Sequence, residues 1–495
     1  MPPGVWPWIS LSLIALDLVV RVALAVRVIA KRTPVPDTLS WLILLLFAPF
    51  ISWVLYLLIG ERRLGTRRVA RFERNTRDLE LQAVRLWAHQ HLDWCDVSGS
   101  NIPLSRLLTT MSGMPALAGN KLELIADAKA YIDSIIADID AATKHVHLLY
   151  YIWEPDDAGT RLVDAVIRAS ERGVACRVLV DSVGSRAFVK SSQPQRLRAA
   201  NVHVVECLPA SLLRTLFARI DLRNHRKIAV IDGQIAYCGS QNITDENFRP
   251  RKLTRIGTSG AGPGPWIDAS VRVHGPAAQA LQSTFMRDWL HDSDEHITDI
   301  SGFLCEPQRM GESAVHVIPS GPGPRPDAIH QAFLATLHGA REEIIMTTPY
   351  FVPDEATKGA LVNAALRGVD VTIVVPEVSD NRLVSAAARS HFEDLLDAGI
   401  KIFRHRPKHG MLHAKCLTVD RDLAVIGSAN FDMRSFWLNF EATLFIYDDD
   451  FAGQLRWLQT SYMEESVQLR LDSWKRRPRR QRFWDNVAQL AGPLL

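Results

Sequence analysis

The sequence predicts an α/β fold of two lobes related by a pseudo-twofold axis, each a mixed β-sheet flanked by helices, preceded by two N-terminal transmembrane helices. Three observations lead to this prediction. Two long apolar segments open the chain, short apolar runs alternate with amphipathic stretches in the rest of it, and one polar motif occurs twice with the same spacing. Alternating strands and helices are typical of α/β domains, and a matched repeat is typical of an internal duplication.

The composition excludes a disordered chain and disfavours a nucleic-acid-binding protein. The chain has 495 residues, of which 47% are hydrophobic and 22% charged, so it is too apolar to be disordered. Its net charge of +3 is unevenly distributed, because residues 1–90 carry +6, residues 470–495 carry +5 and the body between them carries −8. An acidic body disfavours nucleic acid as a partner. The six cysteines follow no paired or zinc-binding spacing, which is typical of reduced thiols.

The N-terminal segments predict a membrane anchor. Residues 39–59 form a run of 21 without a charge, long enough to cross a bilayer as a helix, and Pro49 predicts a kink in it. Residues 5–29 are also apolar but include Asp17 and Arg21, so this segment either spans with the two paired or lies at the interface, and we favour the span. The basic residues that follow are Arg62, Arg63, Arg67, Arg68 and Arg71. By the positive-inside rule, they place both termini and the body on the cytoplasmic side of the membrane.

The rest of the chain divides into two similar halves. LVDAVIRASERGV precedes a predicted strand at 177–181 in the first half, and LVNAALRGV precedes one at 371–375 in the second. The predicted domains are the anchor (1–68), a basic juxtamembrane helix and linker (69–117), the first lobe (118–300), the second lobe (301–469) and a basic tail (470–495).

Each half contains His-x-Lys-x4-Asp followed by Gly-Ser-x-Asn. The first copy consists of His225, Lys227, Asp232, Gly239, Ser240 and Asn242, and the second of His413, Lys415, Asp420, Gly427, Ser428 and Asn430. The interval from His to Asn is 17 residues in both. A single copy would be a weak signal, whereas two matched copies in matched positions are a strong indication of a functional site.

The spacing has a structural interpretation. His and Lys at i and i+2 project from the same face of a strand, and a hairpin then returns Ser and Asn towards them. Asp232 and Asp420 complete the catalytic motif, but they fall at the turn with the opposite parity to the histidines. We therefore expect these two carboxylates to have a structural role in the turn or between the lobes.

The motif also has a chemical interpretation. If the lobes pack face to face, the two His–Lys pairs converge on one site, where one neutral imidazole attacks phosphorus and the other, protonated, donates to the leaving alkoxide. Phosphoryl oxygens would be held by the cations of Lys227 and Lys415, with the hydroxyls and amides of Ser240, Asn242, Ser428 and Asn430. This chemistry requires neither a metal nor a cofactor.

Carboxylates are expected to orient the imidazoles. Asp268 in PWID and Glu441 in LNFE lie downstream of the two motifs and are the candidates, with ordinary surface carboxylates as the alternative. The stretch HDSDEH at 291–296 is rich in metal-ligating residue types, but an ordinary solvated segment is the favoured interpretation.

At these residues the sequence resembles the phospholipase D superfamily with its paired HKD motifs and, more narrowly, the bacterial cardiolipin synthases of the phospholipase D type. The resemblance covers nearly the whole chain, through YLLIGERRLG, the Gly-Asn pair at 119–120, RNHRKIAVIDG, PWID, TPYFVPD, GMLHAK and GSANFDMRS. It implies transphosphatidylation of two phosphatidylglycerol molecules to cardiolipin and glycerol through a phosphatidyl-histidine. It also implies that His225 is the nucleophile and that His413 is the general acid and then the base. A superfamily hydrolase that uses water as acceptor is the alternative.

Three basic segments suggest contact with anionic lipid. His405, Arg406, Lys408 and His409 precede the second motif and either bind headgroups or form a solvated loop. Residues 212–223 have the pattern of an amphipathic surface helix, with packing on its own lobe as the alternative. The tail carries Lys475, Arg476, Arg477, Arg479, Arg480 and Arg482, six basic residues in eight, and we expect it to be attracted to an anionic bilayer.

Overall fold

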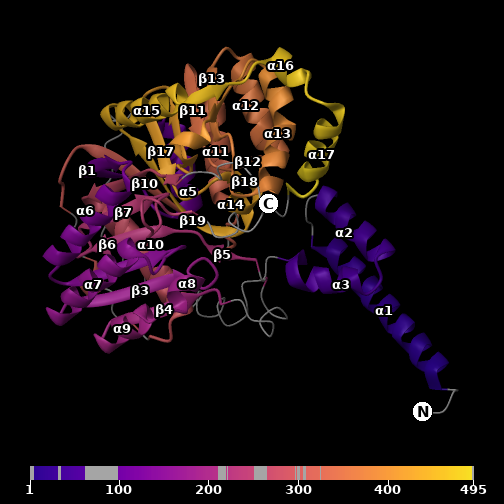
Figure 1. The fold of residues 1–495 in the computed structure, drawn as a ribbon, viewed down its shortest axis with the longest axis horizontal. Coiled ribbons are helices and arrows are strands. Elements are labelled where there is room, and N and C mark those ends of the chain that lie inside the picture. The colour runs from indigo at the N-terminus through magenta and orange to yellow at the C-terminus, as the bar shows by residue number, and fades with distance from the viewer. Residues whose placement is uncertain are drawn as a thin grey trace. The chain divides into compact units, whose positions relative to one another are not determined.

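A computed structural model describes residues 5–31, 35–61, 99–209, 219, 221–249, 265–295, 297, 301–304, 308–323 and 325–492 (Figure 1). The chain divides into two compact units, one formed mainly by the N-terminal helices and one that contains the β-sheet. The predicted basic cluster after residue 61 and most of the predicted amphipathic stretch at 212–223 lie outside the described residues.

The N-terminal unit contains the two predicted helical segments, and the second of them is interrupted. It consists of α1 (Val5–Ala30), α2 (Val35–Phe47), α3 (Ile51–Leu55) and a π-helical turn (Tyr56–Gly60). The kink predicted at Pro49 is a full interruption of the helix between Phe47 and Ile51, because Pro49 cannot continue the hydrogen bonding and Phe50 takes a φ of 60°. Within the described part of this unit, no helix combines the length and the hydropathy needed to cross a bilayer.

The predicted pair of charges in α1 stabilises this break. Nε of Arg21 donates to Oδ2 of Asp17 at 2.7 Å, which confirms the pairing. The other carboxylate oxygen of Asp17 accepts from the backbone N–H of Phe50 at 2.8 Å, and Nη1 of Arg21 donates to the carbonyl of Leu45 at 3.2 Å. The pair therefore satisfies backbone groups that the interrupted helix leaves without an intrahelical partner.

The second unit is built on one sheet that runs through both halves of the chain. In the first half the strand order is β1 (Leu117–Ile125), β9 (Ser270–His274), β7 (Ile235–Gly239), β6 (Lys227–Ile231), β2 (His145–Tyr150), β3 (Ala175–Asp181) and β4 (His203–Cys207). In the second half it is β10 (Ser313–Ser320), β19 (Asn439–Tyr447), β17 (Leu423–Gly427), β16 (Cys416–Val419), β11 (Glu343–Thr347), β13 (Asp370–Pro376), β14 (Lys401–His405) and β20 (Ser466–Gln468).

The two strand orders mirror each other about the junction of β1 and β10. These strands pair antiparallel, with Leu117 opposite Val315. In each half an antiparallel hairpin, β6–β7 or β16–β17, lies beside a parallel group, β2–β3–β4 or β11–β13–β14. The duplication predicted from the motif is thus visible as a pseudo-twofold arrangement of two mixed-sheet lobes, and the mixed α/β class is confirmed.

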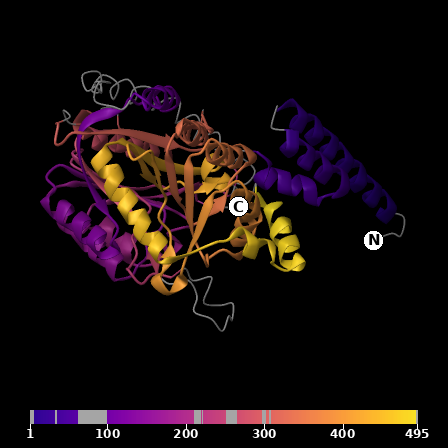
Figure 2. The ribbon, with the colours of Figure 1, turned by 90° about the horizontal axis from the view of Figure 1, so that it is seen from above.

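Helices cover both faces of the sheet. The first lobe contributes α6 (Ala128–Ala141), α7 (Asp157–Glu171), α9 (Gln193–Ala199) and α10 (Pro276–Asp292), and the second contributes α11 (Ala328–Gly339), α12 (Glu355–Leu366), α13 (Arg382–Asp397) and α15 (Asp449–Glu464). One hydrophobic core joins α10 and α15 to strands of both lobes, and Figure 2 shows α15, the long yellow helix, lying along the sheet. Each lobe has a further core of its own beneath its outer helices.

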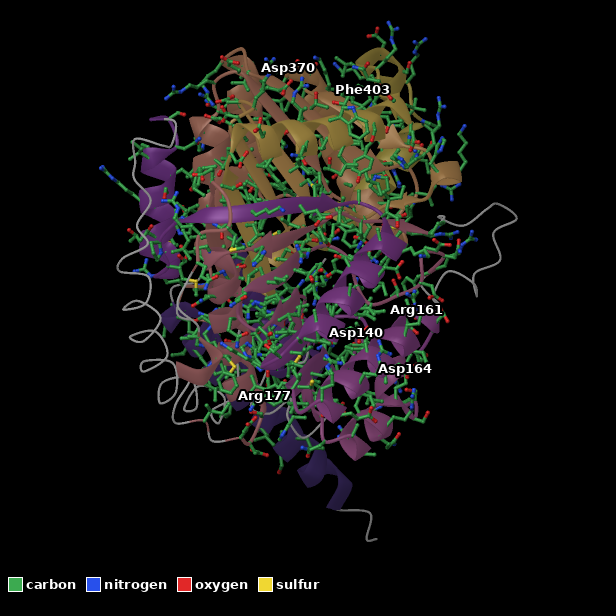
Figure 3. The ribbon with its side chains drawn as sticks, turned by 90° about the vertical axis from the view of Figure 1, so that its left-hand side faces the viewer. Asp140, Arg161, Asp164, Arg177, Asp370 and Phe403 are labelled. Carbon is green, nitrogen blue, oxygen red and sulfur yellow. The ribbon has the colours of Figure 1, made fainter. Side chains whose placement is uncertain are left out.

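Figure 3 shows how far apart the outer parts of the lobes are. Asp140, Arg161 and Asp164 lie on the outer helices of the first lobe, whereas Asp370 and Phe403 lie at the other end of the sheet, in the second lobe. The centre, where the lobes meet, is therefore the region in which residues of both halves come together.

Three short strand pairs add to the main sheet. β5 (Arg223–Asn224) pairs in parallel with β19, β8 (Trp266–Ile267) with β15 (Met411–Leu412), and β12 (Phe351–Val352) with β18 (Phe431–Asp432). The first two pairs cross from one lobe to the other. They bring the segments that follow each motif to the histidine of the opposite lobe.

Candidate active site

The two His–Lys pairs occupy corresponding positions in the lobes. His225 lies between β5 and β6, and His413 lies between β15 and β16. Nζ of Lys227 donates to the carbonyl oxygen of His225 at 2.6 Å, and Nζ of Lys415 donates to that of His413 at the same distance. Each lysine therefore turns back onto its own histidine, as side chains at i and i+2 of an extended segment do.

The carboxylate that orients each imidazole comes from the opposite lobe. Nδ1 of His225 lies 3.0 Å from Oε2 of Glu441, and Nδ1 of His413 lies 2.6 Å from Oδ1 of Asp268. Both carboxylates are buried. Sequence spacing marks both residues as candidates, but it offers no basis for this exchange between the lobes.

The exchange follows from the short strand pairs. The backbone N–H of His225 donates to the carbonyl of Phe440, next to Glu441, at 2.9 Å. In the same way His413 donates to the carbonyl of Ile267, next to Asp268, at 2.8 Å. Two parallel pairs thus hold each histidine one residue away from the other lobe's carboxylate, and neither lobe alone contains a complete His–carboxylate pair.

The hydrogen bonds define which nitrogen of each imidazole carries the proton. Nδ1 of His225 faces Glu441 and, at 3.1 Å, the carbonyl oxygen of Ser428, and both groups are acceptors. Nδ1 of His413 faces the carboxylate of Asp268. Nδ1 is therefore the protonated nitrogen in both neutral imidazoles, and Nε2 is the nitrogen with a lone pair.

Burial keeps both imidazoles neutral before substrate binds. It lowers the pKa of His225 to about 4 and that of His413 to about 3, against the opposing effect of the paired carboxylates. Burial by itself raises the pKa of Asp268 and of Glu441, but the adjacent histidine and lysine outweigh it, so both carboxyl pKa values lie below their usual value. A neutral imidazole held by a charged carboxylate is suited to nucleophilic attack.

The two serines hold the carboxylates. The Ser428 hydroxyl donates to Oε2 of Glu441 at 2.5 Å and accepts from the backbone N–H of Ala442 at 3.0 Å. The Ser240 hydroxyl accepts from the corresponding N–H of Ala269 at 3.0 Å and donates to the Ala269 carbonyl at 3.1 Å, and its proximity to Asp268 helps to lower the pKa of that carboxyl. Both serine side chains are fully buried. Both hydroxyls are thus engaged within the protein, and their predicted phosphate contact stays a prediction.

The two asparagines are placed differently. Oδ1 of Asn242 accepts from the backbone N–H of Ile152 at 3.0 Å, whereas its Nδ2 has no hydrogen-bond partner among the described residues. Oδ1 of Asn430 also has none within the described part of the chain. Buried amide groups without a partner are costly, so these atoms are available to a bound ligand.

The third residue of each motif lies away from the site. The Asp232 carboxylate accepts from three successive backbone N–H groups, those of Thr143, Lys144 and His145, at 2.8–2.9 Å. The Asp420 carboxylate does the same for the N–H groups of residues 341, 342 and 343, at 2.8–3.1 Å. Both aspartates lie at the far end of the hairpin strand from the histidine, a position that favours the structural role expected from their parity over a catalytic one.

Aromatic rings line the two histidines, and sequence reasoning missed them. The Trp266 ring stacks on His413 with centroids 4.0 Å apart, and the Tyr151 ring lies 4.7 Å from that of His225 and 5.1 Å from Nζ of Lys227. The position of Trp266 in PWID, two residues before Asp268, was the available signal. These rings pack against the imidazoles and restrict the orientation of their planes.

A buried ion pair distinguishes the first lobe from the second. Arg226, between His225 and Lys227, pairs with Asp288 of α10, and its Nε donates to the carbonyl of Glu441 at 2.9 Å. The corresponding residue of the second motif is Ala414, which has no such side chain. The backbone at Glu441 is therefore held more firmly than that at Asp268, and the two halves of the site are not equivalent.

Two other predicted features have structural partners. In HDSDEH, Glu295 pairs with Arg177 at 2.6 Å and accepts from the indole of Trp289, while His296 lies outside the described residues. His405 is buried against Glu465 at 3.1 Å, which favours a structural role for it over headgroup binding. Across the described ranges, no cluster of three His, Cys, Asp or Glu side chains has the arrangement of a metal site.

The lysines predict opposite effects of pH on activity and on stability. Burial lowers the pKa of Lys227 to about 7 and that of Lys415 to about 8. We expect kcat/KM to fall as the pH rises through 7–8, because the cations that hold the phosphoryl group lose their protons. In the unfolded chain both lysines have a pKa of 10.5, so between pH 7 and 10.5 the unfolded state binds more protons than the folded state. The free energy of unfolding therefore rises with pH across this range.

The effect on stability is tested by measuring the melting temperatures of wild type and Lys227→Met between pH 6 and 10. The variant should be inactive and more stable than wild type near neutral pH, and its advantage should shrink towards pH 10. A variant whose advantage is constant across this range would contradict the lowered lysine pKa.

A duplicated α/β lobe that brings two His–Lys pairs into one site is the architecture of phospholipase D-like enzymes. The family profile described as cardiolipin synthase, PLD-like domain, matches residues 135–253 and 333–458, and the profile described as phospholipase D-nuclease N-terminal matches residues 19–61. This chain belongs to the cardiolipin synthase family of phospholipase D-like enzymes.

Individual relatives match over nearly the whole length. Cardiolipin synthase A of Proteus mirabilis is 36% identical, with 95% of each chain covered, and that of Serratia proteamaculans is 37% identical, with 94% of this chain and 93% of the relative covered. The crystal structure of phosphatidylserine synthase from Haemophilus influenzae Rd KW20 aligns with a TM-score of 0.58 over 79% of this chain and 100% of that one, at 15% identity. This last similarity concerns the fold.

Proposed function

We propose that this protein is a membrane-bound phosphatidyltransferase that converts two phosphatidylglycerol molecules into cardiolipin and glycerol. The main support for this proposal is the site itself, which contains two carboxylate-bound imidazoles and two buried lysines. In each His–carboxylate pair the two residues come from different lobes. Nearly full-length similarity to relatives named cardiolipin synthase A supports the choice of lipid.

In the first step, Nε2 of His225 attacks the phosphorus of one phosphatidylglycerol. A phosphorus–nitrogen bond forms, the bond to the glycerol oxygen breaks, and the glycerol leaves with a proton from His413. In the second step, His413 removes the proton from a hydroxyl of the second phosphatidylglycerol, whose oxygen attacks the phosphorus and releases His225. One phosphodiester is exchanged for another, so the reaction needs no nucleotide.

The proton for the leaving glycerol is available beside His413. Nζ of Lys415 lies 3.1 Å from Nε2 of His413, and the lysine keeps its proton more readily than the imidazole because its pKa, about 8, is the higher of the two. A bound phosphodiester anion raises the pKa of His413 and favours transfer of the proton to it along this contact. His413 then serves as acid, and afterwards as base.

The same contact supports His225 as the nucleophile. The lone pair of His413 Nε2 accepts from Lys415, whereas no described side chain hydrogen-bonds Nε2 of His225. His225 is also the more exposed of the two, at 9% against 3%. Its lone pair is therefore the one that is free to approach phosphorus.

The phosphoryl oxygens are held mainly by the two ammonium groups. Lys227 and Lys415 supply positive charge in a buried site, where charge acts strongly. The free Nδ2 of Asn242 adds a neutral donor. Ser240 and Ser428 act on the carboxylates instead, and so contribute indirectly.

We also propose that the N-terminal unit anchors the enzyme in the bacterial inner membrane as two spans, with both lobes on the cytoplasmic side. The uncharged run at 39–59 and the internal pairing of Asp17 with Arg21 support this proposal. The family profile that matches residues 19–61 covers the same segment.

The function is tested by incubating the purified protein with phosphatidylglycerol vesicles and a chelator, with His225→Ala as the inactive control, and following the lipids by mass spectrometry. We expect cardiolipin and glycerol in equal amounts and no loss of rate with chelator. Phosphatidic acid without cardiolipin would show a hydrolase instead. Complete loss of activity with chelator would contradict catalysis by the lysine cations alone.

A further inference from the structure

The C-terminal helix α17 (Arg479–Gln489) packs against α13 through one face (Figure 1). Asp485 and Ala488 on this face are buried. Asp485 pairs with Arg389 of α13 at 2.7 Å, and Arg482 pairs with Glu393, one turn along α13, at 3.1 Å. The two helices are thus antiparallel and fixed to each other, so the orientation of α17 on the second lobe is set by its ion pairs.

The opposite face of α17 carries an exposed apolar stripe. Its members are Phe483, Trp484, Val487 and Leu490, with 60%, 57%, 37% and 82% of their surface exposed. Their spacing of i, i+1, i+4 and i+7 places them on one side of the helix. Leu383, 45% exposed at the adjacent end of α13, extends the stripe. Large side chains exposed together in this way mark an interaction surface.

Two arginines lie on the same side of the helix as the stripe. Arg479 and Arg480 precede Phe483 and Trp484 by one turn, and both are exposed. Three of the six basic residues of this segment, Lys475, Arg477 and Arg482, form ion pairs with acidic residues. No carboxylate within the described residues pairs with Arg479 or Arg480. The side chains of Arg479 and Arg480 are thus not engaged by acidic residues of the described part of the chain, and they lie beside the stripe.

The helix also adjoins the region of the active site. Ala488 belongs to a small core with Val352 and Val384, and a Cβ placed on Gly492 would lie 3.6 Å from Val352. Val352 pairs with Asp432, two residues after Asn430 of the second motif. The stripe therefore lies on an element that packs directly on the strands leading from that motif.

We propose that α17 is an interfacial docking helix, which inserts its apolar stripe at the boundary of headgroups and acyl chains and places Arg479 and Arg480 against anionic lipid. The inference rests on the proposed function for the identity of the surface, a bilayer that contains phosphatidylglycerol. A side with Trp and Phe beside Arg suits such an interface. The stripe has far fewer than the roughly 20–30 residues a side that a stable protein interface buries.

The direct test is a fluorescent reporter on the full-length protein. Leu490→Cys is labelled with an environment-sensitive dye, with Leu366→Cys on α12, 74% exposed, as the matched control. Cys95 and Cys305 are replaced by serine so that the dye reacts at the introduced cysteine. The other four cysteines, Cys176, Cys207, Cys238 and Cys416, are buried and can stay. The protein is placed in bilayers of phosphatidylcholine with or without phosphatidylglycerol.

We expect the dye at 490 to shift to the blue and to be quenched by spin-labelled lipid when phosphatidylglycerol is present, while the dye at 366 does neither. A dye at 490 that stays in water in these bilayers would overturn the proposal. So would a dye that is shielded from water but is not quenched by spin-labelled lipid, because protein would then cover the stripe.

A functional test separates docking from catalysis. Combining Phe483→Ser, Trp484→Ser and Leu490→Ser should raise the KM for phosphatidylglycerol in vesicles by about tenfold or more. It should leave kcat/KM for a soluble short-chain phosphatidylglycerol unchanged. Trp457→Ser on α15, 73% exposed in wild type, is the control and should change neither.

The charges are tested in the same assay. Arg479→Gln and Arg480→Gln should each raise the vesicle KM by about fivefold at low salt. Unchanged vesicle kinetics in both sets of variants would overturn docking. If wild type makes no cardiolipin from either substrate, the proposed function fails, and the dye experiment still decides the docking surface.

Discussion

Replacing either motif histidine with alanine should abolish cardiolipin synthesis. We expect the rates of His225→Ala and His413→Ala to fall by about 10⁴-fold or more, because one variant lacks the nucleophile and the other lacks the only group positioned as both acid and base. Both proteins should remain folded but melt below wild type, since each substitution leaves a buried carboxylate without its imidazole partner. The measurement is the initial rate of cardiolipin formation from phosphatidylglycerol vesicles.

The control is His338→Ala, which changes an exposed histidine on α11 and should keep the wild-type rate. The two variants should also be equally inactive when mixed, because both histidines serve one site in one chain. Substantial activity in either variant alone would contradict a reaction that needs two imidazoles.

Neutralising the two carboxylates should give the second largest loss. Glu441→Gln and Asp268→Asn keep the shape of the side chain but no longer fix the proton on Nδ1, and a loss of roughly 10²–10⁴ in turnover is expected. Because the carboxylates are exchanged between the lobes, Glu441→Gln should impair formation of the phosphatidyl-enzyme, like His225→Ala. Asp268→Asn should let it accumulate, like His413→Ala.

Single-turnover measurements with labelled phosphatidylglycerol separate these two behaviours, and Glu464→Gln, at an exposed position of α15, is the control. If Glu441→Gln accumulated the phosphatidyl-enzyme and Asp268→Asn did not, each carboxylate would serve the histidine of its own lobe and the exchange seen in the structure would have no functional meaning.

The local features of this site can be predicted from the sequence. The parity of His225 and Lys227 predicts that they share a face, and the opposite parity of Asp232 predicts a turn. In the structure Asp232 and Asp420 take φ values of 53° and 51°, in the left-handed region that aspartate tolerates in turns. These features depend on a few neighbouring residues, so the local pattern is enough to predict them.

The contacts between the two lobes cannot be predicted in this way. His225 and Glu441 are 216 residues apart, and His413 and Asp268 are 145 apart. Their partnership depends on the two-residue strands β5, β8 and β15, which are too short to show periodicity. The serine hydroxyls face the carboxylates for the same reason. Burial, which lowers the pKa of both lysines, also arises only when the two lobes close on each other.

The interruption in the second N-terminal helix is also only partly predictable from the sequence. Pro49 predicts a kink in the apolar run at 39–59, but the full interruption is stabilised by Asp17 and Arg21, which supply partners for the freed backbone groups. A charged pair in an apolar helix was recognised as a pair, but its contact with the break depends on how the helices pack. Local composition does not encode that packing.

In the proposed mechanism, His225 becomes the covalent carrier of the phosphatidyl group in a site completed by the second lobe. The most direct test is to react His413→Ala with phosphatidylglycerol, quench at neutral to basic pH and map the lipid adduct by peptide mass spectrometry. We predict a phosphatidyl group on His225 in this variant and no adduct in His225→Ala. An adduct on His413 in His225→Ala, with none on His225 in His413→Ala, would contradict the assignment.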